Sequence, residues 1–206
     1  MKTKRLLVLA IATIASTAIF AQSKTTFGVR AGVNFYNLTG KNSGNDDLEN
    51  KIKVGFNAGV NAEIPVGIDF FVQPGLLFST KGAKSKNIDQ TTSLSYVELP
   101  VNLIYKPELG EGKMLLGFGP YVAYGVGGKY ELSGVETDIE FGNDLPSELK
   151  PFDAGANLLV GYEFSNNFSF QLNASLGMIN LYNRPAGDTK SKIKNTGFGL
   201  SLGYRF

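Results

Sequence analysis

The chain has 206 residues, a formal net charge of +2, and neither cysteine nor histidine. Without cysteine, disulfides, thiolate metal sites and a lipid-modified cysteine are excluded, and without histidine every mechanism that needs an imidazole base is excluded. A nearly neutral chain gives no electrostatic case for nucleic-acid binding, and 25 glycines with 15 phenylalanines are typical of a turn-rich all-β protein.

The chain begins with the pattern of a secretory signal peptide. Three basic residues lie within the first five positions, an apolar run follows over 6–20, and Ala21 is a plausible cleavage point. An apolar run of roughly 15 residues is short for a spanning helix. An uncleaved signal anchor is the alternative, because Ile19 is bulkier than the small residue preferred three positions before the cut. We predict a signal peptide over 1–21 and one domain over 22–206.

Eight segments of the predicted domain alternate bulky apolar side chains with small or polar ones. This period of two is that of a β-strand with one apolar face. The alternation is clearest in the last segment, where five apolar side chains alternate with glycine, serine and arginine. The predicted strands cover about 27–36, 53–64, 69–79, 96–106, 113–130, 152–164, 168–178 and 197–206.

The links between these strands alternate in length. Those after the second, fourth and sixth strands are short, and those after the first, third, fifth and seventh are long and polar, over about 38–52, 80–92, 131–151 and 182–195. Outer-membrane barrels have an even strand number, short periplasmic turns, long external loops and both termini in the periplasm. We therefore predict an all-β fold, an eight-stranded antiparallel up-and-down transmembrane β-barrel with both termini periplasmic.

Aromatic residues support the membrane assignment. They gather on the apolar face where it would meet the periplasmic interface, at Phe27, Phe70, Tyr105, Phe164, Phe168, Tyr204 and Phe206. The last two of these end the chain, and we predict that they form the signal by which the C-terminal strand engages the barrel assembly machinery. A soluble barrel of lipocalin type is the rival structure. Its narrow interior could not hold so uniformly large an apolar set.

The polar face carries ionic side chains that would lie in the barrel lumen. Because an unpaired charge in a low-dielectric interior is very costly, these charges must pair there. We predict a lumen ionic network that plugs the barrel. A narrow conduit for ions or small solutes is the alternative, since charged linings can also select ions. The predicted network comprises Arg30, Glu63, Glu98, Glu163 and Arg205.

Three stretches resemble one known family. The sequences FVQPGLLFSTKG at 71–82, YVELPVNLIYKP at 96–107 and GFGPYVAYG at 117–125 are similar to the outer-membrane β-barrel domain family that includes PorT-like proteins. The resemblance extends from about 25 to 206. It implies a porin-family outer-membrane barrel of Gram-negative bacteria, most of whose members have no assigned biochemical activity, and it transfers no functional residue.

The remaining candidates for function lie in the long loops. Oxygen ligands at 45–49 are of the kind calcium uses, but their order does not match an EF-hand, so a solvated acidic loop is expected. Acidic residues over 131–148 face lysines at 81–86 and 190–194, and the lysines could meet lipopolysaccharide phosphates. We find no catalytic motif, metal site or cofactor site. The sequence favours a non-enzymatic structural or surface-interaction protein of the outer membrane, in contact with its lipid.

Overall fold

The computed structural model describes residues 24–143, 149–183, 185 and 187–206. The predicted signal peptide, 1–21, lies outside these residues. No helix among them is long and apolar enough to cross a membrane.

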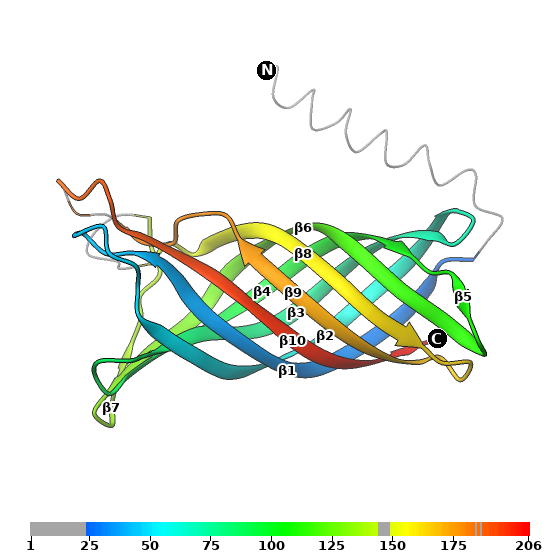
Figure 1. Ribbon diagram of the computed structural model, residues 1–206, viewed down its shortest axis with the longest axis horizontal. Coiled ribbons are helices and arrows are strands. Elements are labelled where there is room, and N and C mark those ends of the chain that lie inside the picture. Colours follow the sequence, from blue (N-terminus) through cyan, green and yellow to red (C-terminus); the bar gives the residue numbers. More distant parts are fainter. Residues whose placement is uncertain (1–23, 144–148, 184, 186) are drawn as a thin grey trace, which may run out of the picture.

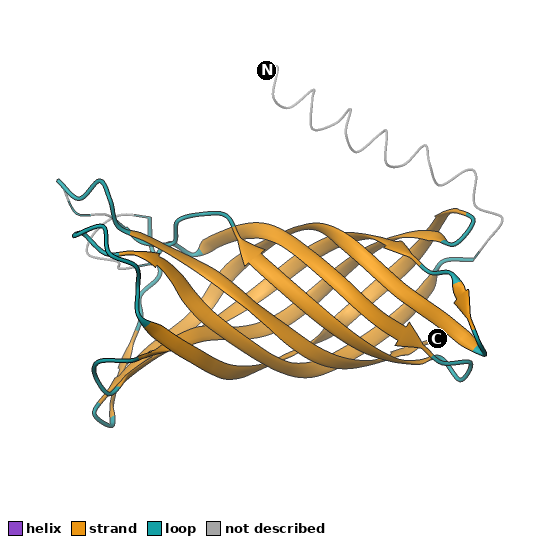
Figure 2. Ribbon diagram, in the orientation of Figure 1, coloured by secondary structure: helices purple, strands orange, loops and turns teal. Residues whose placement is uncertain are grey.

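Within the described residues, eight long antiparallel strands close into a ring (Figures 1 and 2). Each strand pairs with its neighbours in chain order, β4 pairs directly with β6, and β1 pairs with β10 to close the barrel. The predicted eight-stranded up-and-down barrel is therefore confirmed. The long strands are β1 (Thr26–Lys41), β2 (Asn50–Gly67), β3 (Phe70–Ser85), β4 (Gln90–Tyr105), β6 (Gly112–Leu132), β8 (Phe152–Glu163), β9 (Phe168–Gly177) and β10 (Lys192–Arg205).

Two short strands lie outside the ring, one at each end. β5 (Glu108–Leu109) and β7 (Val135–Asp138) both pair with β6. β5 belongs to the link between β4 and β6. β7 folds back on the end of β6 to make a hairpin beyond the barrel wall, at the end opposite the C-terminus (Figure 1).

The strands run further into the predicted loops than the sequence indicates. The link after β3 is the clearest correction. The prediction placed it over 80–92, but β3 and β4 remain paired from Thr80 opposite Ser95 to Lys84 opposite Thr91, which leaves only 86–89 between them. A polar segment can remain a β-strand outside the membrane, because the backbone hydrogen bonds to the neighbouring strand continue there. The links after β1, β6 and β9 remain longer, and all four lie at the barrel end away from the C-terminus.

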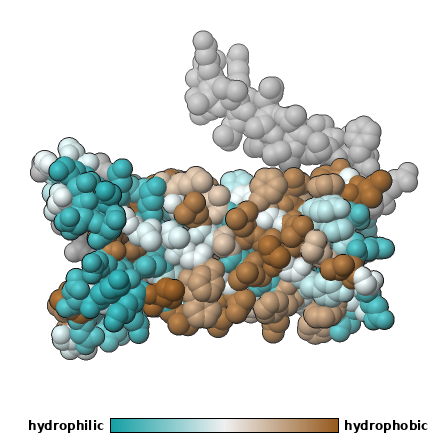
Figure 3. Space-filling model, in the orientation of Figure 1, coloured by the Kyte–Doolittle hydropathy of each residue, from teal (hydrophilic) through white to brown (hydrophobic). Residues whose placement is uncertain are grey.

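The outer surface of the barrel carries a broad apolar band, brown in Figure 3, with hydrophilic residues beyond it at the long-loop end. Valines, leucines and phenylalanines of the strands are exposed there, such as Val60, Phe118 and Leu202 at 52–66%. Exposed apolar side chains on this scale would be costly in water but are stabilised by lipid. The apolar face therefore lies outside and the polar face inside, as the sequence predicts.

Two aromatic belts bound this band. The lower belt, at the short-turn end, contains the predicted aromatic residues, with rings stacked at 4.8 Å between Phe70 and Tyr105. The upper belt was not predicted. Its rings meet across neighbouring strands, 5.1 Å apart between Phe35 and Phe198, and its members are Phe35, Phe56, Phe78, Tyr124, Phe152 and Phe198. A transmembrane barrel is expected to carry an aromatic girdle at each interface.

Candidate functional site

The barrel interior near the C-terminus holds a cluster of four charges. The Nζ atom of Lys106 lies 2.9 Å from Oε2 of Glu63 and 2.8 Å from Oε2 of Glu163. Arg205 closes the cluster, with Nη2 2.7 Å from Oε1 of Glu63 and Nε 3.4 Å from Oε2 of Glu163. All four residues are buried. Two cations and two carboxylates balance, so this layer, the lower ionic layer, carries no net charge.

The lower layer contains three of the predicted network residues, Glu63, Glu163 and Arg205. Neutral side chains complete their bonding. Gln73 donates to Glu63 at 3.0 Å, and Arg205 also donates to Asn61 at 3.1 Å. These groups come from β2, β3, β8 and β10, and Lys106 follows β4. The contacts of Arg205 in β10 with Glu63 and Asn61 in β2 therefore span β1 and the seam where the barrel closes.

A second ionic group, the upper ionic layer, surrounds Lys81, which is 1% exposed. Its Nζ atom lies 2.6 Å from Oε1 of Glu98 and 3.5 Å from Oδ2 of Asp153. The same Asp153 oxygen accepts hydrogen bonds from Tyr121 at 3.2 Å and from Asn195 at 2.9 Å. The predicted Glu98 thus pairs with a lysine that the sequence analysis had placed in an external loop.

Three tyrosine rings enclose the ammonium group of Lys81. The centroids of Tyr36, Tyr96 and Tyr121 lie 5.1, 5.2 and 4.7 Å from its Nζ atom. Ring faces attract cations most strongly where water is excluded. With two carboxylates and three rings around it, the lysine is held by strands on opposite sides of the barrel.

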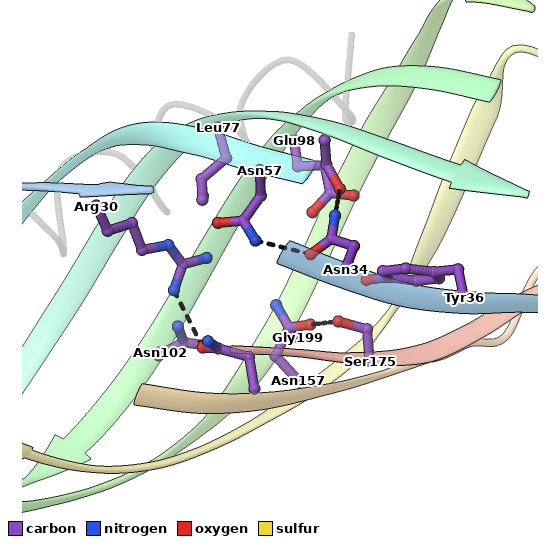
Figure 4. A pocket seen from close by; sticks show the side chains of 12 residues that line it. Arg30, Asn34, Tyr36, Asn57, Leu77, Glu98, Asn102, Asn157, Ser175 and Gly199 are labelled. Carbon is purple, nitrogen blue, oxygen red and sulfur yellow. Dashed lines mark hydrogen bonds between the residues drawn. The ribbon is translucent and has the colours of Figure 1, made fainter. Parts of the chain in front are cut away.

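The fifth predicted residue, Arg30, lies apart from the carboxylates. Its Nη1 atom donates to Oδ1 of Asn173 at 3.1 Å, and it forms no salt bridge among the described residues. It lines a polar cavity of about 30 Å³ between the two ionic layers, shown in Figure 4. Asn34 and Asn57 bond each other across the cavity wall at 2.7 Å. A polar space of this volume has room for about one or two water molecules.

Above the upper ionic layer the interior is apolar. Inward residues of the strands form a buried cluster with residues that follow β7 and β9. A backbone hydrogen bond from Lys150 N to the Leu181 carbonyl, 2.7 Å long, ties these two links together, and one from Gly142 N to the Leu149 carbonyl, 3.0 Å long, lies within the first link. We call this cluster the apolar cap. It contains Leu38, Ala83, Leu94, Tyr96, Tyr121, Ala123, Ile139, Leu149 and Leu181, with Tyr130, Phe141 and Ile193 packed against it.

Sequence reasoning missed the residues that complete the interior. By the alternation of the predicted strands 96–106 and 152–164, Lys106 and Asp153 fall on the inward face, but the predicted network does not include them. Lys81 was missed because it was assigned to a loop, although it continues the inward alternation of Gln73, Leu77 and Ser79. Extending that period by one more inward position would have found it.

Outside the barrel, no salt bridge among the described residues joins the acidic loop to the lysines at 81–86 or 190–194. The salt bridge observed there lies within the β6–β7 hairpin, where Lys129 Nζ is 2.6 Å from Oε2 of Glu136. This hydrogen bond and the charge of Glu136 raise the pKa of the Lys129 ammonium group. Both side chains are more than half exposed, so the pair adds little stability. Asp144 and Glu148 of the acidic loop lie outside the described residues.

Comparison with solved structures shows the same fold in two proteins of low sequence identity. Neisserial surface protein A is 12% identical, with a TM-score of 0.52, and a major outer membrane protein from Thermus thermophilus is 17% identical, with a TM-score of 0.51. The attachment invasion locus protein of Yersinia pestis, in complex with the heparin analogue sucrose octasulfate, is 13% identical with a TM-score of 0.45. Each comparison covers 89% of this chain and 100% of the other.

A search of curated protein sequences gave no match. A comparison with protein-family profiles gave a match. The profile that describes the outer membrane protein beta-barrel domain matches residues 20–183, most of the chain. Together with the closed barrel and its apolar outer band, this match shows that the chain belongs to the outer membrane protein beta-barrel domain family and is a protein of the outer membrane.

Proposed function

We propose that this protein is a non-conducting outer-membrane barrel that acts as a structural or surface-interaction protein through its long-loop end. The observation that supports the proposal is the stacking of paired charges and apolar side chains in the interior. Two ionic layers and the apolar cap follow one another along the barrel, and the polar cavity between the layers is about 30 Å³. A path for solutes would have to break both ionic layers and displace the cap.

Planar-bilayer recording tests this proposal against the alternative of a narrow porin. Wild-type protein is expected to give no discrete openings. A variant that weakens both ionic layers and the cap, Glu98→Ala with Arg205→Ala and Leu149→Ala, is expected to leak, which shows that the assay detects an opened lumen. Lys129→Ala with Glu136→Ala, outside the barrel, is the matched control and should stay silent. Discrete openings of the wild type would refute the plug and support a porin.

The orientation of the barrel in the outer membrane is part of this proposal. We infer that residues 1–21 are removed as a signal peptide, that both mature termini lie in the periplasm and that the links after β1, β3, β6 and β9 face outward. The three longest links, after β1, β6 and β9, lie at that end of the barrel, and outer-membrane barrels place their longer loops outside. The chain has no cysteine, so single-cysteine variants report orientation cleanly. A membrane-impermeant maleimide applied to intact cells should label Ser133→Cys and leave Ser165→Cys unlabelled. The opposite pattern would reverse the orientation.

A further inference from the structure

Four lysines lie on the barrel wall beyond the upper aromatic belt, in two directly opposed pairs. Lys41 of β1 is paired with Lys192 of β10, and Lys51 of β2 with Lys84 of β3. The strands β3, β2, β1 and β10 are consecutive in the ring, so both pairs lie on one side of the barrel. We call these four residues the lysine collar.

The collar side chains point outward. Lys84 follows the buried Ala83, and Lys192 follows the buried Ser191. Directly paired residues of neighbouring strands share one face. Lys41 therefore lies on the face of Lys192. Lys51 is exposed and directly opposite Lys84, at the end of β2 beyond the register shift between Ile52 and Asn57. The collar lies at the ends of β1, β2, β3 and β10 that adjoin the long links. Figure 3 shows that this end of the barrel is hydrophilic.

One acidic residue lies next to the collar, because Asp47 is paired with Lys41 in an isolated β-bridge. Like charges directly opposite each other on a sheet are destabilising, and none of the four lysines forms a salt bridge among the described residues. Lys41 Nζ donates instead to the backbone carbonyl of Asn45 at 3.3 Å. Two repelling pairs on one surface, neither of which a salt bridge among the described residues neutralises, are the arrangement that an external anion would stabilise.

The height of the collar above the upper aromatic belt indicates which anionic groups of the membrane it can reach. Lys41, Lys84 and Lys192 each lie six positions from an upper-belt aromatic of the same strand, Phe35, Phe78 and Phe198 respectively. Six positions are about 20 Å of strand, or about 15 Å along the axis at a tilt of about 40°. Headgroup layers of ordinary phospholipids extend only about 5–8 Å beyond the hydrocarbon core. The collar therefore stands above phospholipid phosphates, among the sugars of an outer-leaflet glycolipid.

We propose that the lysine collar binds phosphate groups on the core sugars of lipopolysaccharide, at the level of the saccharide rather than of lipid A. The proposal rests on the orientation proposed above, which places the collar on the outer leaflet. Such a contact fixes the barrel laterally in the glycolipid layer through the side formed by β3, β2, β1 and β10. Basic residues next to a membrane surface favour anionic headgroups in the same way.

The test compares thermal unfolding in vesicles of four compositions: zwitterionic phospholipid alone, and the same lipid with phosphorylated-core lipopolysaccharide, with lipid A, or with phosphatidylglycerol at equal charge. The test variant is Lys84→Gln with Lys192→Gln, which removes one lysine from each pair. The control is Lys24→Gln with Lys113→Gln, an equal charge change at exposed sites at the short-turn end.

Wild type and control are expected to melt on the order of 5 °C higher with core-bearing lipopolysaccharide than with zwitterionic lipid. The test variant should lose most of that shift. In zwitterionic lipid alone, the test variant should melt at or above the wild-type temperature, because the repulsion within each lysine pair is removed. A normal melting transition there also shows that the variant folds. Equal shifts in wild type and test variant would overturn the collar, and equal shifts with lipid A or phosphatidylglycerol would overturn the core-sugar assignment. Bilayer conductance is measured separately, so failure here leaves the plug standing.

Discussion

At the residue scale, Lys81 shows how the interior depends on partners. Its ammonium group is removed from water, and two carboxylates and three tyrosine rings replace that water. Asp153 is also fully buried and depends on the same lysine. Breaking a buried ion pair from one side leaves an uncompensated charge, whereas replacing all its members can be nearly neutral.

Lys81→Met should therefore lower the free energy of unfolding by about 3–5 kcal/mol, because Glu98 and Asp153 would remain buried without their cation. The triple variant Lys81→Met with Glu98→Gln and Asp153→Asn should recover most of the loss. Urea unfolding in vesicles measures both. Lys129→Met, which breaks only an exposed pair, should change stability by less than about 1 kcal/mol. A triple variant no more stable than the single one would contradict this account of the upper ionic layer.

At the element scale, glycines permit close contact where β1 and β10 close the barrel. A Cβ atom at Gly32 would collide with the Leu200 carbonyl oxygen and lie 2.6 Å from the Ser201 Cα atom. Backbone atoms cannot give way as a flexible side chain does. At Gly127 in β6, a Cβ atom would meet nothing within 4 Å.

Gly32→Ala is accordingly expected to reduce the yield of folded barrel severely, since the β1–β10 seam would have to separate. Gly127→Ala is the matched control and should fold like the wild type. The folded fraction is read from the heat-dependent shift of the barrel on electrophoresis after refolding in detergent. Normal folding of Gly32→Ala would show that the seam can adjust.

The terminal strand provides a second prediction at this scale. Phe206 is 70% exposed, and its ring lies 5.2 Å from that of Tyr204, so it adds little packing to the folded barrel. Phe206→Ala should leave spontaneous refolding into vesicles nearly unchanged but reduce the folded protein in cells, where the assembly machinery must recognise the strand. Phe164→Ala, an exposed aromatic in a turn, is the control. If both variants reduced the amount of folded protein in cells equally, the proposed role of Phe206 in assembly would be contradicted.

At the scale of the whole molecule, the two aromatic belts set a membrane thickness. Belt residues of one strand lie eight positions apart in β1, β3 and β10, between Phe27 and Phe35, Phe70 and Phe78, and Phe198 and Phe206. Eight positions are about 26 Å of strand and, at a tilt of about 40°, about 20 Å of height. The barrel thus fits a hydrocarbon layer thinner than the average of about 30 Å.

We expect the free energy of unfolding to be highest in vesicles whose hydrocarbon layer is about 20–25 Å thick and to fall as longer acyl chains thicken it, by fractions of a kcal/mol per Å of mismatch. A series of phosphatidylcholines differing only in chain length gives the measurement. Stability that rises steadily up to about 30 Å would mean that the belts do not mark the membrane interfaces.

The sequence by itself determined the strands, their two faces and the membrane compartment, because alternation is a local property of each strand. Only the tertiary structure decided which lumen charges meet. Lys81 and Asp153 lie 72 positions apart, and Lys106 and Glu163 lie 57 apart. Their contact depends on the register of strands that other strands separate in the ring, which no single strand encodes. The apolar cap has the same origin: Ile139, Leu149 and Leu181 become interior only because two polar links fold over the opening.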